Sequence, residues 1–167
     1  MYCPGNHVDH SLGMVAVGGT APDFTLKNQN GEAVSLSSFR AGEEEEDEGK
    51  RVVVFFYPKD DNPGCGEEAQ SFDADLSKFK ELGAEVIGIS SDADHSKFVR
   101  EYGLSMTLLS EVGGKVRKEW AVKRALLGTW DGRVTYVLDA NGVVISTYDS
   151  LLDFAGHSKE ALKALRG

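Results

Sequence analysis

The stretch Arg51–Cys65 reads Arg-Val-Val-Val-Phe-Phe-Tyr-Pro-Lys-Asp-Asp-Asn-Pro-Gly-Cys, and it decides the fold of the chain. Val52–Tyr57 is an unbroken β-branched and aromatic run with polar residues on each side, a pattern typical of a strand buried on both faces. Pro58 cannot continue a strand ladder, and Pro63-Gly64 turns the chain once more. We therefore expect Cys65 to lie just beyond the end of a central strand.

A helix is predicted to follow the cysteine. Glu67 and Glu68 place negative charge in its first turn, and Gly83 ends it. An apolar stripe runs along it at Ala69, Phe72, Leu76, Phe79 and Leu82. The thiol of Cys65 is thereby expected at a helix N-terminus, where free backbone N–H groups and the positive end of the helix dipole favour a thiolate.

Composition is that of one soluble globular domain. Of the 167 residues, 41% are apolar and 27% are charged. No apolar run approaches the roughly 20 residues of a membrane span, and the N-terminus lacks the pattern of a secretory signal. The formal net charge of −9 argues against a nucleic-acid partner, because phosphate binding needs clustered lysine and arginine. Much of that charge lies in Glu43–Glu48, which we interpret as a solvated loop.

Cys3 and Cys65 are the only cysteines of the chain. Two cysteines are too few for a disulfide scaffold, so a reducing compartment is expected. An isolated cysteine is usually a small buried hydrophobic residue, but the helix-start position of Cys65 favours a nucleophile. Cys3, His7 and His10 have only a loose metal-ligand spacing and form an incomplete set, so no metal site is predicted. Residues 1–18 are expected to form a flexible arm, and residues 19–167 the domain.

The elements before and after the cysteine helix are predicted from local patterns. A β-hairpin joins Phe24–Leu26 to Val34–Leu36 across a type I′ turn at Asn30-Gly31. A strand over residues 84–90 follows the cysteine helix and should run parallel to the central strand, because strand–helix–strand crossovers are right-handed. Ser91-Asp92 is expected to cap a helix over residues 94–102, with His95 exposed on it.

The rest of the chain completes a mixed sheet. One helical turn is predicted at 37–40, an extended piece at 107–109, a short helix at 115–120, a surface loop at 123–129, a strand at 134–138, a type I′ turn at Asn141-Gly142, an antiparallel strand at 143–148 and a helix at 157–165. The fold class is α/β, with a mixed central β-sheet and helices on both faces.

This architecture, with a thiol at the first helix after a central strand, resembles a thioredoxin-like fold. Thioredoxins carry Cys-x-x-Cys, whereas Cys65 is flanked by Asn62-Pro63-Gly64 and Gly66-Glu67-Glu68, so dithiol exchange is disfavoured. Phe56–Cys65 instead resembles the peroxiredoxin signature Pro-x-x-x-Thr/Ser-x-x-Cys. Tyr57-Pro58 and Pro63-Gly64-Cys65 are similar to the subfamily called peroxiredoxin Q or bacterioferritin comigratory protein. Further similar segments occur in family order at Ala21–Phe24, Glu85–Ser90, Thr107–Ser110, Lys115–Lys118 and Gly132–Asp139.

The resemblance implies a role for each matching residue. The Cys65 thiolate would attack one peroxide oxygen and become a sulfenic acid, for which its pKa must fall below the free value of about 8.5. Arg133 matches the active-site arginine and would polarise the peroxide. Pro58 would shape and shield the pocket, while the backbone N–H groups around Gly64 and Cys65 would bind developing negative charge.

Substrate binding is expected from Gly64, Tyr57 and Glu68. Glu68 matches a glutamate of the family, and both it and Glu67 are expected to face solvent or to orient an arginine. Because Glu67 and Glu68 oppose a thiolate electrostatically, helix stability and thiol activation compete in this turn.

Two positions depart from the family. Asn62 stands where the family has a Thr or Ser that hydrogen-bonds the peroxide and the thiolate; its amide can donate but is longer and planar, which predicts a slower peroxidase or a shifted substrate. Gln70 stands where many members carry a resolving cysteine. The sulfenic acid would then be reduced by an external thiol, by a partner chain, or by Cys3, whose arm of about 15 residues averages roughly 20 Å end to end.

The resemblance therefore predicts a thiol-dependent peroxidase of one-cysteine type for hydrogen peroxide and small organic hydroperoxides. Thioredoxin, glutaredoxin or glutathione would be the reductant, with no cofactor and no nucleic-acid or membrane partner, and the chain would be a monomer or weak dimer. The expected location is cytoplasmic, or the plastid stroma or lumen in a photosynthetic eukaryote. The alternatives are a redox-sensing or binding module with weak turnover and an inert interaction domain that uses its acidic loop.

Overall fold

The computed structural model describes residues 15–44, 46–124 and 131–167. Within them a seven-stranded mixed sheet has the order β2-β1-β5-β4-β3-β6-β7. Its strands are β1 (Thr25–Asn28), β2 (Ala33–Ser35), β3 (Arg51–Phe56), β4 (Ala84–Ser90), β5 (Thr107–Ser110), β6 (Val134–Leu138) and β7 (Val144–Asp149). The helices are η1 (Leu36–Phe39), α1 (Pro63–Ala74), α2 (Leu76–Glu81), α3 (Ser96–Tyr102), α4 (Lys115–Glu119) and α5 (Gly156–Arg166).

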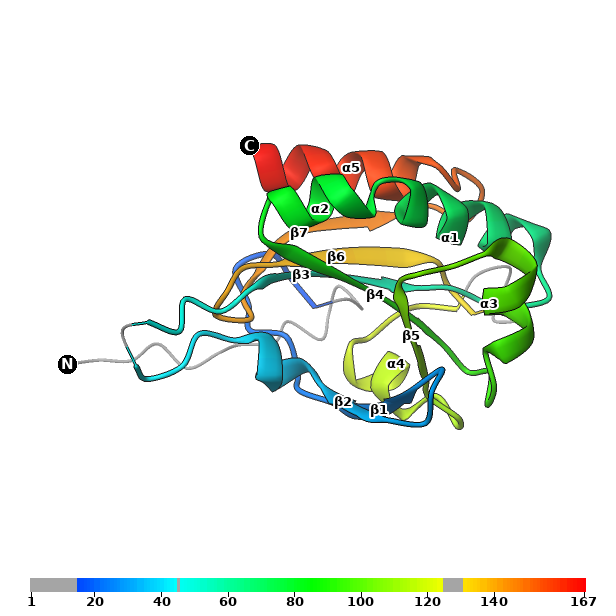
Figure 1. Ribbon diagram of the computed structural model, residues 1–167, viewed down its shortest axis with the longest axis horizontal. Coiled ribbons are helices and arrows are strands. Elements are labelled where there is room, and N and C mark those ends of the chain that lie inside the picture. The colour runs from blue at the N-terminus through cyan, green and yellow to red at the C-terminus, as the bar shows by residue number, and fades with distance from the viewer. Residues whose placement is uncertain (1–14, 45, 125–130) are drawn as a thin grey trace.

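Helices cover both faces of this sheet. Figure 1 shows α1, α2 and α5 along one face and α4 on the other. The predicted α/β class and mixed sheet are therefore confirmed, and each predicted strand has its counterpart within one or two residues.

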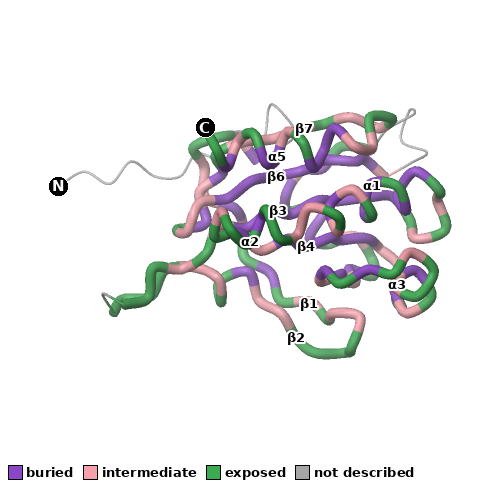
Figure 2. The backbone as a smooth tube through the Cα atoms, turned by 45° about the horizontal axis from the view of Figure 1, so that its top comes forward, coloured by how far each residue is buried: buried purple, intermediate pink, exposed green. Residues whose placement is uncertain are grey.

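The central strand is β3. It runs parallel to β4, pairing Val53 with Val86, and antiparallel to β6, pairing Val53 with Val137. Alternate side chains of β3 enter two separate cores, with Val52, Val54 and Phe56 on one face and Val53 and Phe55 on the other. Figure 2 shows the buried backbone running through β3, β4 and β6. A strand buried on both faces and a parallel strand–helix–strand unit are thus confirmed.

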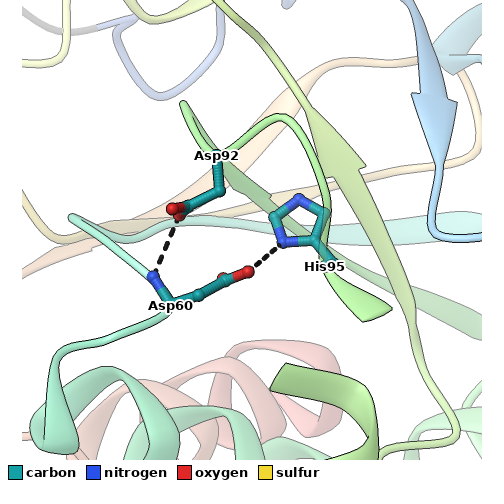
Figure 3. Close-up of side chains that lie close together, drawn as sticks. All are labelled: Asp60, Asp92 and His95. Carbon is teal, nitrogen blue, oxygen red and sulfur yellow. Dashed lines mark hydrogen bonds and ion pairs between the residues drawn. The ribbon is translucent and has the colours of Figure 1, made fainter. Parts of the chain in front are cut away.

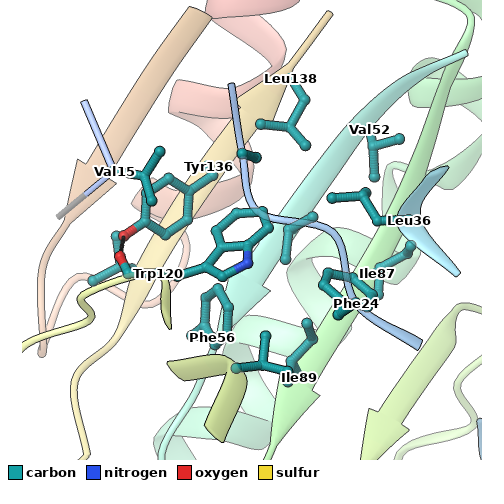
Figure 4. Packing of buried hydrophobic residues seen from close by; sticks show 14 of the residues in the cluster. Val15, Phe24, Leu36, Val52, Phe56, Ile87, Ile89, Trp120, Tyr136 and Leu138 are labelled. Atoms are coloured by element: carbon teal, nitrogen blue, oxygen red, sulfur yellow. Dashed lines mark hydrogen bonds between the residues drawn. The ribbon is translucent and has the colours of Figure 1, made fainter. Parts of the chain in front are cut away.

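Trp120 organises the core on the α4 side. Its side chain is fully buried, and its ring lies 5.4 Å from that of Phe56, 5.0 Å from that of Tyr136 and 6.0 Å from that of Phe24, measured between centroids (Figure 4). The indole N–H donates to the Pro22 carbonyl at 3.2 Å, so its polar atom is satisfied. This packing fixes the segment before β1 against the centre of the sheet.

The two predicted type I′ turns are wrong. A type I′ turn needs positive φ at both central residues, but Asn30 and Asn141 lack it. The Gly31 N–H instead donates to the Asn28 carbonyl and the Gly142 N–H to the Asp139 carbonyl, with φ of +77° and +80° at the two glycines. Each hairpin therefore uses a turn that starts at Asn or Asp and ends at a left-handed glycine.

The helices differ from prediction at their starts. The single helix expected after Cys65 is two helices, α1 and α2, with a break at Asp75. The helix expected from residue 94 begins at Ser96, where the Asp94 carboxylate accepts the Ser96 N–H at 2.8 Å. Ser91-Asp92 is not its cap. Gly103, with φ of +62°, ends α3 as predicted.

The described N-terminal residues, from Val15 on, pack against the domain within the stretch predicted as a flexible arm. Val15 is buried, and its N–H donates to the Trp120 carbonyl at 3.3 Å, while the Gly18 N–H donates to the Val144 carbonyl at 2.8 Å. Residues 15–18 thus pack onto the fold. Residues 1–14, with Cys3, and most of the predicted loop at 123–129 lie outside the described residues.

The acidic loop is exposed in its described part. Its described carboxylate residues, 43–44 and 46–48, are all exposed, as predicted for a solvated loop (Figure 2). Among the described helices, none has the length and apolar character that crossing a bilayer requires.

Candidate active site

The turn between β3 and α1 positions Cys65. Pro58, the second residue after β3, is buried, and the chain turns back so that Pro63 is the first residue of α1. Cys65 is the third residue of that helix and its side chain is fully buried. The predicted position of the thiol, just beyond a central strand and at a helix start, is therefore what the structure shows.

Asn62 caps α1. Its side-chain oxygen Oδ1 accepts the Gly64 N–H at 2.8 Å and the Cys65 N–H at 3.4 Å, and its backbone carbonyl accepts the Cys65 N–H at 3.0 Å. The resemblance implies that these two N–H groups bind developing negative charge and that the Asn62 amide donates to the peroxide. In the structure these two N–H groups are engaged by Asn62, so developing negative charge would compete with the cap for them. The cap uses the Asn62 amide oxygen and not its NH₂ group, so donation from that group to the peroxide stays a prediction.

Arg133 lies directly before β6, beside the end of β3 because Val134 pairs with Phe56. Among the described residues its guanidinium donates three hydrogen bonds: Nε to the Leu151 carbonyl at 2.9 Å, Nη1 to the Glu68 carboxylate, and Nη2 to Cys65 Sγ at 3.4 Å. The side chain is 2% exposed, so the charge is held in place away from water. Arg133 thus meets the thiol in the position that the family resemblance implies.

Glu68 is the counter-ion of Arg133. Its side chain is fully buried; Oε2 accepts from Arg133, and Oε1 has no hydrogen-bond partner among the described residues. Burial raises the pKa of this carboxyl from 4.5 to about 7, although Arg133 opposes the shift. Of the two roles that the sequence left open, Glu68 orients the arginine, and Glu67 faces solvent.

The environment of Cys65 does not lower its pKa, contrary to the sequence-based expectation. Burial raises the pKa of the thiol above its ordinary value, and the Glu68 charge adds to this. The Arg133 charge, a backbone hydrogen bond from Lys59 and the Arg133 hydrogen bond oppose the rise without cancelling it. The Asn62 cap has already engaged the helix N–H groups that would otherwise favour the thiolate. Formation of the thiolate therefore depends mainly on Arg133.

Two aromatic rings pack against the glycines on either side of Cys65. The guanidinium of Arg133 lies 4.9 Å from the centroid of the Phe154 ring, and that ring occupies the space that a Cβ atom at Gly64 would need. The ring of Tyr102 does the same at Gly66. Both positions require glycine because the rings lie directly on the helix backbone. Phe154 and Tyr102 are not among the predicted site residues, because both are far from Cys65 in the chain.

Tyr57 contributes packing and not a free hydroxyl. Its ring is fully buried in the core that also contains Cys65, and its hydroxyl donates to Asp60 at 2.7 Å and lies 3.3 Å from His95 Nδ1. The substrate-binding role predicted for Tyr57 therefore finds no free hydrogen-bonding group. The prediction of an exposed His95 is wrong as well: it is 1% exposed, because Asp60 and Leu109 hold it between the β3–α1 loop and β5.

Gln70 is exposed on α1. In an α-helix, residues five positions apart have Cα atoms roughly 8–9 Å apart, which is longer than a disulfide allows. A cysteine at position 70 could therefore reach Cys65 only if α1 unwound. Cys65 is the only cysteine in the part of the chain that the structure describes.

The fold and this site together define a thiol peroxidase class: a buried thiol at a helix start, paired with an arginine and a glutamate on a thioredoxin-like sheet. The model of the AhpC/TSA family matches residues 17–147, so the chain belongs to that family.

Individual relatives indicate which subfamily of thiol peroxidases the chain resembles. The chain is 50% identical over 156 residues to "Peroxiredoxin Q, chloroplastic" from Oryza sativa subsp. japonica, covering 92% of this chain and 68% of the relative. It is 49% identical over 154 residues to the protein of the same name from Sedum lineare, covering 91% and 78%. The crystal structure of peroxidoxin BcpB from Mycobacterium tuberculosis superposes with a TM-score of 0.77 at 34% identity, covering 90% and 96%. These similarities confirm the predicted resemblance to peroxiredoxin Q, the thioredoxin-like fold and a thiol peroxidase activity.

Proposed function

We propose that this peroxidase works with one cysteine, Cys65, and reduces hydrogen peroxide and small organic hydroperoxides at the expense of an external thiol. The observation that carries the proposal is the contact between Arg133 Nη2 and Cys65 Sγ at 3.4 Å, in a buried pocket on a helix whose position 70 holds an exposed glutamine.

The oxidation step uses the geometry around Arg133. The Cys65 thiolate attacks the hydroxyl-bearing oxygen of the peroxide; an S–O bond forms and the O–O bond breaks. The sulfur is oxidised to a sulfenic acid, and the peroxide is reduced to a hydroxide or alkoxide that takes a proton from water. Arg133 stabilises first the thiolate and then the negative charge on the peroxide oxygens, since its guanidinium carries several donors and a permanent charge.

The reduction step needs a thiol from outside the described residues. One thiol condenses with the sulfenic acid, giving a mixed disulfide and water; a second thiol attacks that disulfide and returns Cys65 to its reduced form. Thioredoxin, glutaredoxin and glutathione supply suitable thiols, and Cys3 is the alternative within the chain.

The burial of Cys65 and the position of the Phe154 ring support a preference for small peroxides. Cys65 is fully buried, and Phe154 lies over Arg133, so a bulky hydroperoxide must displace the ring to reach the sulfur. An alkyl group small enough to fit would contact the same ring.

A plastid location is the one we favour. It rests on the relatives, whose names describe them as chloroplastic.

A redox-sensing role is the second candidate. The raised pKa of Cys65 and its complete burial favour slow oxidation, and a protein that is oxidised without efficient recycling would report peroxide more than remove it.

The recycling step is tested by comparing the wild-type protein with Cys3→Ser. We expect both to turn over peroxide with thioredoxin or glutathione at the same rate, because reduction uses an external thiol. Peptide mass mapping of peroxide-treated wild-type protein, without reductant, should show no bond between Cys3 and Cys65.

Abundant Cys3–Cys65 disulfide together with lost turnover in Cys3→Ser would overturn the one-cysteine proposal. Rapid oxidation of Cys65 that none of the thiols reverses would favour the sensor. Cys65→Ser is the matched control for background peroxide consumption in each assay.

A further inference from the structure

His95 is a buried imidazole whose two nitrogens both face hydrogen-bond acceptors. Nδ1 lies 2.7 Å from Asp60 Oδ2 (Figure 3). Nε2 lies 3.1 Å from the Leu109 carbonyl. The other carboxylate oxygen of Asp60 accepts the Tyr57 hydroxyl at 2.7 Å. A carbonyl can only accept, so Nε2 carries a proton; the short contact of Nδ1 with a carboxylate then needs a second proton. The hydrogen bonds therefore fit an imidazolium paired with the carboxylate of Asp60.

His157 provides the contrast within the same molecule. It is equally buried, but its Nδ1 faces the Thr135 hydroxyl at 2.8 Å and its Nε2 the Ser150 carbonyl at 2.7 Å. A hydroxyl can donate, so a neutral imidazole satisfies both contacts. Burial lowers the pKa of His157 to about 4, in keeping with a neutral ring. The partners, not burial alone, set the different charge states of the two histidines.

The His95 pair is attached to the loop that presents the catalytic cysteine. Asp60 lies between Lys59, whose backbone hydrogen-bonds the Cys65 thiol, and Asn62, the cap of α1. A second hydrogen bond links Asp60 to the β4–α3 loop, because the Asp60 N–H donates to Asp92 at 2.9 Å (Figure 3). A displacement of Asp60 would therefore also move Lys59 and Asn62, which both contact Cys65.

We propose that protonated His95 is a positioning residue for the peroxidase reaction: paired with Asp60, it fixes the Pro58–Asn62 loop around Cys65, and the rate of Cys65 oxidation falls when His95 loses its proton. This inference rests on the peroxidase function of Cys65. Without the second proton, either the Asp60 bond or the Leu109 bond is lost, and the loop loses an anchor.

The charges around the pair set the direction of the pH dependence. Asp60 and the Tyr57 hydroxyl face His95 from the β3–α1 loop, Asp92 lies beside it on the β4–α3 loop, and β5 contributes the Leu109 carbonyl. Arg117 on α4 donates to the Tyr57 carbonyl and is paired with Glu111.

The pKa of His95 follows from these neighbours. Burial acts to lower it, but the hydrogen bond and charge of Asp60, the hydrogen bond to the Leu109 carbonyl and the charge of Asp92 together raise it above the ordinary value. Because the folded pKa is raised, the stabilisation is complete below the unfolded pKa of about 6.5. It is lost as pH rises through the folded pKa.

A proton explains the cluster better than a metal ion does. Asp60, Asp92 and His95 offer ligand atoms within 4.8 Å of one another. However, Asp92 Oδ2 already accepts from Ser90 at 2.7 Å and from the Asp60 N–H, and the contact between Nδ1 and Asp60 Oδ2 leaves no room for a cation between them.

The first test is the protonation state of the imidazole. In protein carrying ¹⁵N-labelled histidine, we expect the His95 ring nitrogens to show imidazolium shifts at neutral pH and the His157 ring nitrogens to show neutral ones. Asp60→Asn should bring His95 to the neutral form, because an amide can donate to Nδ1. A neutral His95 in the wild type at neutral pH overturns the proposal, whatever the peroxidase activity.

The second test is the ratio of the Cys65 oxidation rates of wild type and His95→Gln from mildly acidic to alkaline pH. This ratio cancels the titration of Cys65 itself. We expect a ratio of about 10 to 100 at acidic pH, since misplacement of a reacting group has effects of this size, and a fall towards one as His95 deprotonates. The ratio for His157→Gln should not change over this range. A His95→Gln ratio that is constant with pH would reduce His95 to a structural role and overturn the proposal.

Discussion

Arg133→Lys is expected to slow the oxidation of Cys65 by peroxide by about 10²–10³-fold, the effect of removing one positioned donor from a developing negative charge. Lysine keeps the charge but has one nitrogen, whereas Arg133 reaches Leu151, Glu68 and Cys65 with three. Because a lysine ammonium that pairs with Glu68 cannot also contact the sulfur, the pKa of Cys65 should rise further. Rapid-quench oxidation followed by mass spectrometry measures the rate.

The choice of lysine keeps the protein folded. Removing the charge would leave the buried Glu68 carboxylate unpaired, which typically destabilises a protein by about 3–5 kcal/mol. Arg166→Lys, at an exposed site on α5, is the matched control and should change nothing. An oxidation rate within threefold of wild type in a folded Arg133→Lys protein would show that Arg133 does not assist the oxidation of Cys65.

Glu68→Gln is expected to lower the pKa of Cys65. The Glu68 charge helps to hold that pKa up, and glutamine of the same shape still offers an oxygen to Arg133. The pH dependence of Cys65 alkylation by iodoacetamide reports the shift. Glu67→Gln makes the same charge change one residue earlier on the exposed side of α1, so it should have a far smaller effect.

The same substitution should change how stability depends on pH. The folded pKa of Glu68 is raised from 4.5 to about 7, so the folded state binds more protons between these values and loses stability as pH rises through them. Urea denaturation across this interval should show that loss in wild type and in Glu67→Gln, and less of it in Glu68→Gln. If the free energy of unfolding depends on pH equally in all three proteins, burial does not raise the pKa of Glu68.

The strands were predictable because their signal is local. The apolar run Val52–Tyr57 and the segment 84–90 need no partner to be identified, and the positions of β3 and β4 follow from them. The two turns also have a local signal, which differs from the predicted type I′ pattern: Asn28 and Asp139 each stand three residues before a glycine, the pattern of the turn that the structure contains.

The site was predictable where it depended on chain neighbours and on the family signature. The position of Cys65 at a helix start follows from the sequence around it, whereas its pairing with Arg133, which is 68 residues away, came only from the resemblance. Asn62 before Pro63 is the pattern of an N-cap followed by a first-turn proline, so the sequence around it predicts the capping role that the structure shows.

Burial of polar residues was the part that local patterns could not give. His95 sits in a polar segment and looks solvated, but its partner Asp60 is 35 residues earlier in the chain. Phe154 reaches the site from the loop before α5, and neither its spacing nor its neighbours distinguish it from a core residue.

The most direct measurement of Cys65 as the peroxide-reactive thiol is its oxidation by one equivalent of hydrogen peroxide in the presence of dimedone, followed by stopped-flow and mass spectrometry. We expect a second-order rate far above that of a free thiolate, and one dimedone adduct per chain on Cys65, because a sulfenic acid without an internal resolving thiol persists long enough to be trapped. Oxidation no faster than a free thiolate, or an adduct that forms equally on Cys3, would contradict Cys65 as the peroxidatic cysteine of this chain.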